Sequence, residues 1–258
     1  MNTQYQDLRV MVTAGASGIG LGIAQAFAQA GAQVEISDIS AEAIQAALPS
    51  IPAGGGRYAD ASKPSDVDTW FAHALARLGG LDVLVNNAGI AGPTAGIEDI
   101  EPEQWDATMA VNLRSQYLCI RRALPALRQS RRACIINLSS VAGRMGYPLR
   151  TPYAASKWGV IGLTQSLALE LGNDDITVNA ILPGIVDSER SRLVTAAKAQ
   201  ARGISESAMQ AEILENVALH RKVPLSDVAQ AALFLASPAG RSMTGQSLNI
   251  CAGIQSLC

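Results

Sequence analysis

The chain has 258 residues, of which 48% are hydrophobic and 16% charged, and its formal net charge is −2. This composition excludes a disordered chain and supplies the core of one domain spanning residues 1–258. It also lacks the strongly basic balance that is typical of nucleic-acid binding. The N-terminal residues have no signal-peptide pattern, and no apolar run reaches about 18 residues, so we expect a cytoplasmic protein without a membrane span.

Short apolar runs alternate along the chain with longer segments of helical periodicity. In chain order we expect strand 8–13, helix 18–30, strand 33–37, helix 41–48, strand 57–59, helix 66–78, strand 81–86, helix 102–128, strand 133–139, helix 153–171, strand 176–182, helix 227–236 and strand 247–250. Residues 54–56 are interpreted as a surface turn. Strands that are apolar on both faces and separated by helices indicate a parallel sheet covered on both sides. The sequence therefore predicts a single-domain, Rossmann-type doubly wound α/β fold with a mostly parallel seven-stranded sheet.

The turn between the first strand and the first helix has the sequence TAGASGIG, at residues 13–20. Glycines at such a turn let the backbone approach a pyrophosphate at the helix N-terminus. Asp38 ends the second strand, 18 residues after Gly20, and no Arg or Lys follows it. A carboxylate at this place accepts hydrogen bonds from a ribose diol and repels a 2′-phosphate, so NAD is favoured over NADP. The alternative is a plain glycine turn beside a solvated aspartate.

Polar or glycine-bearing turns follow three later strands, at the sheet edge where α/β proteins bind ligands. They are NNAG at residues 86–89, the pair Ser139 and Ser140, and a Pro-Gly turn at 183–184. Tyr153 and Lys157 open the next helix with i, i+4 spacing, which places them on one face. The ammonium of Lys157 is expected to lower the tyrosine pKa and so produce a proton acceptor for a hydroxyl group.

Together these motifs resemble the short-chain dehydrogenase/reductase family, of the compact single-domain type, over nearly the whole chain. The resemblance implies Tyr153 as the acid/base and Ser140 as the donor that polarises the substrate oxygen. It further implies that Lys157 binds the nicotinamide ribose and that Asn112 holds a water in a proton relay. Tyr153 and Lys157 count among the cofactor contacts as well. The other cofactor-binding residues that the resemblance implies are Gly15, Ser17, Gly18, Ile19, Gly20, Asp38, Asp60, Ala61, Asn87, Ala88, Gly89, Pro183, Val186 and Ser188.

Three positions depart from the family pattern. Ala14 stands where the family has its first glycine, which is expected to weaken cofactor binding. Ser188 replaces the usual threonine and keeps the hydroxyl. Residues 251–253 read Cys-Ala-Gly in place of Asp-Gly-Gly, a change that bears on subunit contacts. The family resemblance implies a homotetramer, in which the helices 102–128 and 153–171 pair between subunits.

Residues 187–222 are expected to form the lid over the substrate. This segment and the loop before Tyr153 carry several cations: Arg144, Arg150, Arg190, Arg192, Lys198, Arg202, Arg221 and Lys222. Arginines recognise carboxylate or phosphate in bidentate fashion, and Arg190, near the Pro-Gly turn, is the preferred substrate contact. A solvated lid is the alternative, because acidic residues share the segment. Neither the two histidines nor the cysteines (Cys119, Cys134, Cys251 and Cys258) have metal-ligand or disulfide spacing, so no metal is expected.

The leading hypothesis is an NAD-dependent oxidoreductase that interconverts a secondary alcohol and a ketone. The substrate would be a small polyol, sugar or hydroxy acid, which is anionic if the arginines bind it. One alternative is a 3-oxoacyl thioester reductase of the same fold, which normally uses NADPH and is disfavoured by Asp38. Another is a non-enzymatic NAD-binding regulatory protein, disfavoured by the intact set of Ser140, Tyr153, Lys157 and Asn112.

Overall fold

A computed structural model describes residues 3–254; residues 1–2 and 255–258, with Cys258, lie outside the described part. Its centre is a seven-stranded sheet in the order β3-β2-β1-β4-β5-β6-β7, in which every neighbouring pair is parallel. The strands are β1 (Arg9–Thr13), β2 (Gln33–Asp38), β3 (Gly55–Tyr58), β4 (Val83–Asn86), β5 (Cys134–Leu138), β6 (Thr177–Pro183) and β7 (Ser247–Ile250). The expected doubly wound α/β fold is confirmed, and the sheet is wholly parallel rather than mostly so.

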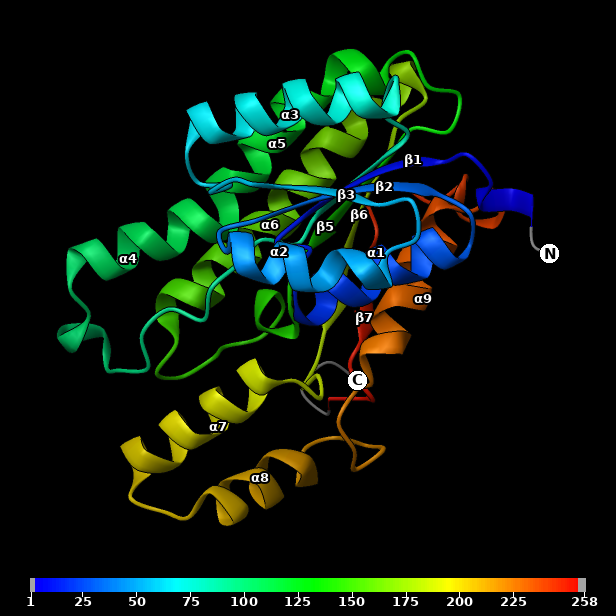
Figure 1. The fold of residues 1–258 in the computed structure, drawn as a ribbon. Coiled ribbons are helices and arrows are strands. Elements are labelled where there is room, and N and C mark those ends of the chain that lie inside the picture. Colours follow the sequence, from blue (N-terminus) through cyan, green and yellow to red (C-terminus); the bar gives the residue numbers. More distant parts are fainter. Residues whose placement is uncertain (1–2, 255–258) are drawn as a thin grey trace.

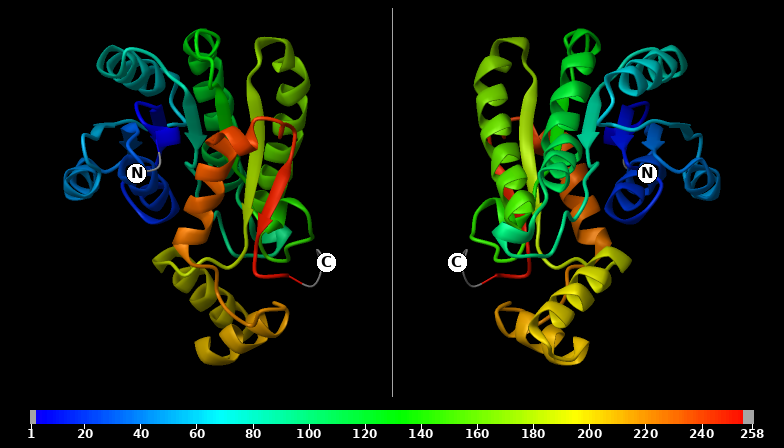
Figure 2. Two further views of the ribbon diagram at one scale, coloured as in Figure 1. Left: turned by 90° about the vertical axis from the view of Figure 1, so that its right-hand side faces the viewer. Right: turned by 90° about the vertical axis from the view of Figure 1, so that its left-hand side faces the viewer.

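Helices cover both faces of the sheet (Figures 1 and 2). The helices of the described residues are α1 (Gly18–Gln29), α2 (Ala41–Ala47), α3 (Pro64–Leu78), α4 (Pro102–Met109), α5 (Ser115–Leu127), α6 (Thr151–Glu170), α7 (Glu189–Arg202), α8 (Glu206–Glu215) and α9 (Leu225–Ala236), of which α7 and α8 lie beyond the sheet. Side chains of β1 alternate between the two cores, because successive residues of a strand point to opposite faces. Val10 and Val12 pack with α1, α2 and α9, whereas Met11 packs with α3 and α5.

The strand order reverses between β1 and β4, which pair directly. In open α/β sheets, such a switch point at the carboxyl ends of the strands forms the ligand crevice. The topology therefore places the turns after β1, β4, β5 and β6 around one crevice.

The predicted helix 102–128 is divided by a π-helical turn, Ala110–Arg114, between α4 and α5. Asn112 lies in this turn. Single π-turns within α-helices are rare and occur frequently at functional sites. The expectation of one continuous helix was therefore wrong at the position that carries a predicted site residue.

The interpretation of residues 54–56 as a surface turn was wrong in part, because Gly55 and Gly56 begin β3. A Cβ on Gly56 would lie 2.7 Å from Cγ2 of Ile44 and 2.9 Å from Cγ1 of Ile36. Glycine is thus needed here for the close approach of β3 to α2 and β2.

The expected lid forms two helices, α7 and α8, which extend from the end of β6 below the sheet in Figure 1. No helix within residues 3–254 has the length and apolar character needed to cross a membrane. In the same range, no group of three or more His, Cys, Asp or Glu side chains is arranged to hold a metal ion.

Candidate active site

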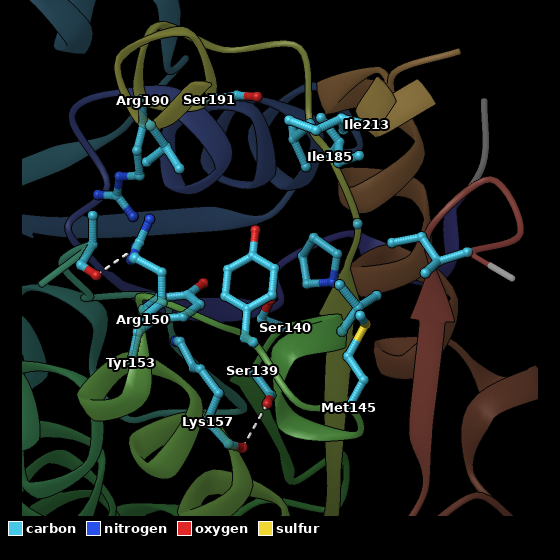
Figure 3. A pocket seen from close by; sticks show the side chains of 18 of the residues that line it. Ser139, Ser140, Met145, Arg150, Tyr153, Lys157, Ile185, Arg190, Ser191 and Ile213 are labelled. Carbon is cyan, nitrogen blue, oxygen red and sulfur yellow. Dashed lines mark hydrogen bonds between the residues drawn. The ribbon is translucent and has the colours of Figure 1, made fainter. Parts of the chain in front are cut away.

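A cavity of about 440 Å³ lies at the carboxyl ends of β4, β5 and β6 and beneath α7 (Figure 3). It brings together side chains from the turns after four strands and from the first turns of α6 and α7. The predicted site residues that line it are Ile19, Asn87, Gly89, Ser140, Tyr153, Lys157, Pro183, Val186, Ser188 and Arg190. Residues assigned to the far end of the cofactor, such as Asp38 and Asp60, lie away from this cavity, on the turns after β2 and β3.

The two serines after β5 have different surroundings. The Ser139 hydroxyl donates to the carbonyl of Lys157 at 2.8 Å and so ties the end of β5 to α6. The Ser140 Oγ accepts from the amide of Ala142 at 3.2 Å, which leaves its proton free to donate. A hydrogen bond between the Ser140 and Tyr153 hydroxyls lowers the tyrosine pKa. Ser140 is therefore the serine that faces the reacting side of the pocket.

Burial raises the pKa of the Tyr153 phenol above its usual value. The hydrogen bond from Ser140 and the nearby charges of Arg150 and Arg190 oppose this shift but are smaller than it. The expected depression of the tyrosine pKa by Lys157 is therefore not found in the chain without its cofactor. Tyr153 is a protonated acid at neutral pH, suited to give a proton to a carbonyl oxygen.

Lys157 is only 4% exposed, and its Nζ lies 5.7 Å from the centre of the Tyr153 ring. The ammonium donates to the carbonyl of Leu138 at 2.8 Å. Burial, with a smaller effect of Arg190, lowers the pKa of Lys157 to about 7. The protein therefore maintains a poorly solvated amine beside the tyrosine, next to Gly89 and the pocket.

The side chain of Asn112 is completely buried and fully hydrogen-bonded. Its Oδ1 accepts from the amide of Ile90 at 2.7 Å, and its Nδ2 donates to the carbonyl of Ile90 and to Ser156 Oγ. These bonds hold the turn after β4 against α6. The side chain is thus occupied in positioning, and its role in a water relay remains a prediction.

The glycine turn after β1 fits a dinucleotide. A Cβ on Gly20 would lie 2.2 Å from the carbonyl oxygen of Ala14, so this turn admits no side chain there. Ser17 caps α1 without a side-chain hydrogen bond, which leaves the first amides of that helix for an anionic group. The side-chain Nδ2 of Asn87 donates to the carbonyls of Thr13 and Ala14, each at 3.0 Å, and joins this turn to the end of β4.

Asp38 faces the glycine turn from the end of β2. Its Oδ2 accepts from the amide of Ala16, and its Oδ1 from the amide of Ser40, each at 3.2 Å. Arg57 pairs with Ser37 across the β2–β3 ladder, so it belongs to the opposite face of the sheet, where its charge acts on Glu35. Among residues 3–254 no cation forms an ion pair with Asp38, and the charge of Arg57 lies on the other face of the sheet from the place where a 2′-phosphate would lie.

Asp60 and Ala61 follow β3 at the same edge. Asp60 accepts from the Ser62 hydroxyl at 2.7 Å, which fixes the turn. The side chain of Asp60 is 25% exposed, and its contact with the cofactor stays a prediction of the family resemblance.

Arg150 was noted in the sequence only as one cation among several, yet it is the pocket's most deeply buried arginine. It is 2% exposed, and its guanidinium carbon lies 5.0 Å from the centre of the Tyr153 ring. Arg190 extends from the first turn of α7 toward it (Figure 3). The sequence signal that could have identified Arg150 was its position three residues before Tyr153, directly before the first residue of α6.

A doubly wound parallel sheet with a tyrosine, a lysine and a serine around its ligand crevice defines a nicotinamide-dependent oxidoreductase fold. A family model described as Enoyl-(Acyl carrier protein) reductase matches residues 13–255. The chain belongs to the short-chain dehydrogenase/reductase family, as its motifs predicted.

Individual relatives cover nearly the whole chain. D-beta-hydroxybutyrate dehydrogenase of Cupriavidus necator is 37% identical over 248 residues, which are 94% of this chain and 96% of that protein. 3-Oxoacyl-(acyl-carrier-protein) reductase FabG of Chlamydia muridarum is 34% identical, with coverage of 98% and 100%. Among solved structures, actinorhodin polyketide ketoreductase with NADPH superimposes with a TM-score of 0.92 at 31% identity, with coverage of 98% and 99%.

Proposed function

We propose that this protein is an NAD-dependent dehydrogenase that interconverts a small secondary alcohol and the corresponding ketone. The observation that carries the proposal is the convergence of Ser140, Tyr153 and Lys157 on one cavity at the switch point of the sheet. When bound, the nicotinamide accepts or gives the hydride. The residues of the chain orient the substrate oxygen and move its proton.

In the direction of ketone reduction, Tyr153 donates its phenolic proton to the substrate oxygen, while the Ser140 hydroxyl donates a hydrogen bond to the same oxygen. In the direction of alcohol oxidation the proton returns to the Tyr153 oxygen. Lys157 would hold the ribose next to the nicotinamide and place positive charge beside the phenolate. Asn112 fixes the turn after β4 on which the cofactor site depends.

The preference for NAD is supported by Asp38 and by the absence of a facing cation. The carboxylate would accept hydrogen bonds from the adenosine ribose and would repel an additional phosphate. The other predicted cofactor contacts, from Gly15 to Ser188, are proposed because the family resemblance implies them. They lie in the turn after β1 and the start of α1, and at or just after the ends of β3, β4 and β6.

A 3-oxoacyl thioester reductase is the second candidate. It is favoured by the relative named FabG and by apolar side chains on the lid side of the pocket, such as Ile185, Ile213 and Val217. Such an enzyme would accept a pantetheine thioester and prefer NADPH.

We also propose a homotetramer. A shallow groove between α4, α5 and α6 has largely apolar lining residues, and Trp158 and Tyr117 on these helices are about half exposed, at 51% and 49%. Such surfaces are typical of subunit contacts. Sedimentation of the purified protein would show a species of four chains.

The experiment for the activity is to measure initial rates with polyols, sugars, hydroxy acids and a 3-oxoacyl thioester, each with NAD(H) and with NADP(H). Turnover with NAD that is lost in Tyr153→Phe, while NAD binding is kept, is the expected result. Turnover confined to the thioester and NADPH would favour the second candidate. Cofactor binding without any turnover would overturn the enzymatic proposal and favour a regulatory NAD-binding protein.

A further inference from the structure

The buried guanidinium of Arg150 lacks most of its hydrogen-bond partners. Its Nη2 donates to the carbonyl of Ala91, after β4, but Nε and Nη1 have no partner although both are buried. A buried charge normally has a counter-ion, and a buried donor normally has an acceptor. The single bond to Ala91 does not account for the two remaining donors, which sit at the wall of the pocket.

The backbone holds Arg150 in this orientation. Leu149, just before it, has φ +62°, in the left-handed region that is uncommon for leucine. The carbonyl of Leu149 accepts from the amide of Ala95, and the amide of Arg150 bonds back to Tyr147. A strained turn that is fixed on both sides therefore presents this arginine to the cavity.

A second arginine approaches from the lid. Arg190 lies on the pocket, and its charge affects the pKa values of Arg150, Tyr153 and Lys157, so it is close to the reacting groups. Two other lid arginines are paired with carboxylates, Arg192 with Glu189 and Arg202 with Glu212. Within residues 3–254, no such pair forms at Arg190.

The cavity as a whole is cationic. Arg150, Lys157, Arg190 and Lys198 line it, and in the described part of the chain no Asp or Glu does. Lys198 lies 4.0 Å from the centre of the Tyr147 ring, which in turn lies 6.3 Å from the Tyr153 ring. A ligand of this pocket would therefore have to supply the negative charge itself.

We propose that Arg150, with Arg190 closing from α7, binds the carboxylate of a small hydroxy acid or keto acid substrate. This rests on the proposed function and narrows its substrate class. The unpartnered Nε and Nη1 of Arg150 lie on different edges of the guanidinium, and each can donate a charge-assisted hydrogen bond to an anionic ligand. Because Arg150 contacts the Tyr153 ring, the carboxylate lies near the oxidised carbon, as in short 2-hydroxy or 3-hydroxy acids.

The test compares each short hydroxy acid with its neutral primary amide, which keeps the size and the reacting carbinol. The wild type is expected to have a kcat/KM about 100-fold or more higher for the acid, since hydrogen bonds to charged groups discriminate strongly. Arg150→Met is expected to bring the ratio of the two constants, acid to amide, close to one, and Arg150→Lys to keep a part of the preference. Arg190→Met, on the exposed lid, is expected to reduce the preference for the acid over the amide to a smaller extent.

Two arginines outside the proposed site serve as matched controls. Arg144 lies exposed in the same loop as Arg150, and Arg192 lies on α7 in an ion pair. Their replacement by Met is expected to leave the ratio of acid to amide unchanged.

A binding measurement tests the proposed anion site independently of the proposed dehydrogenase activity. Titration of malonate, an unreactive carboxylate, into the protein–NAD complex is expected to show binding that Arg150→Met abolishes. If hydroxy acids are not turned over but this binding is found, the anion site is correct and the proposed reaction is wrong. If acids and amides react equally well, or if Arg150→Met slows both alike, the anion site is wrong and the dehydrogenase proposal remains.

Discussion

Arg150 is the N-cap residue of α6 and lies three residues before Tyr153, with the guanidinium carbon of Arg150 5.0 Å from the centre of the tyrosine ring. Both side chains face the same cavity. On the proposed roles, the strained turn at Leu149 holds the group that binds the substrate carboxylate, and the first turn of α6 holds the group that exchanges the substrate proton.

The raised pKa of Tyr153 predicts opposite pH dependences for the two directions. Oxidation needs the phenolate as proton acceptor, so its kcat/KM should rise with pH across the neutral range. Reduction needs the phenol, so its kcat/KM should stay constant until the pH approaches the tyrosine pKa and then fall.

A spectroscopic titration checks the pKa itself. The tyrosinate absorbance of the cofactor-free wild type, minus that of Tyr153→Phe, should reach half of its maximum only above pH 10, because the pKa is raised from 10.0. A tyrosinate that forms near neutral pH would contradict the structural account of burial at this residue.

Lys157 is predicted to lower the free energy of unfolding of the protein, although the proposed reaction requires it. Its pKa of about 7, against 10.5 when unperturbed, means that the unfolded chain binds more protons between these values. The wild type therefore gains stability as pH rises from about 7 to 10.5. At pH 7 and below, the buried ammonium costs at most about 5 kcal/mol, at 1.36 kcal/mol for each pKa unit.

The variant Lys157→Met removes this cost together with the activity. Its free energy of unfolding should exceed that of the wild type at pH 7, and the difference should shrink toward pH 10.5. Denaturant unfolding at several pH values measures this. A variant that is less stable than the wild type at every pH would show that the bond from Lys157 to Leu138 outweighs the desolvation of the ammonium.

Asp38 is predicted to determine the cofactor preference. In Asp38→Asn, the charged acceptor for the ribose is lost and so is the repulsion of a 2′-phosphate. We expect kcat/KM for NAD to fall roughly 10- to 100-fold, because one or two hydrogen bonds to a charged group are lost. We expect kcat/KM for NADP to rise.

Asp68 provides the control for this change, since it is exposed on α3 and pairs with Arg122. Asp68→Asn should change kcat/KM neither for NAD nor for NADP. Equal losses for NAD and NADP in Asp38→Asn would mean that the carboxylate only supports the backbone at Ala16 and Ser40.

Ala14 is predicted to strain the glycine turn. It has φ +49°, the left-handed conformation that costs an alanine roughly 1–2 kcal/mol. Ala14→Gly should remove this strain. The greater freedom of the unfolded glycine chain offsets about 0.4–1 kcal/mol of the gain, so the free energy of unfolding should rise by about 0.5–1 kcal/mol. Thermal unfolding measures the change, and calorimetry with NAD measures the accompanying gain in affinity.

An alanine-to-glycine substitution inside α1 should change the stability in the opposite direction. Ala26→Gly, at a helical position, is expected to destabilise the protein by about 1 kcal/mol. If both variants lose stability alike, the backbone at Ala14 is not strained, and the departure from the family glycine has no consequence.

The sequence predicted the sheet, the motif residues and the crevice, because strand periodicity and strand-end turns are local signals. It could not predict the π-turn at Asn112, since α- and π-helical segments have almost the same apolar pattern. Nor could it predict the burial of Arg150. Arginines are mostly exposed, and the inward direction of this one depends on the left-handed backbone of Leu149 and on contacts with residues after β4.

In the proposed reaction, hydride leaves the carbinol carbon of a secondary alcohol while Tyr153 accepts the hydroxyl proton. The most direct measurement follows the most active alcohol of the panel, deuterated at its carbinol carbon, during oxidation with NAD. We expect the deuterium to appear on C4 of the reduced nicotinamide, on a single face, and to be absent when Tyr153→Phe replaces the wild type. Reduced cofactor without deuterium, or unchanged transfer in Tyr153→Phe, would contradict the account.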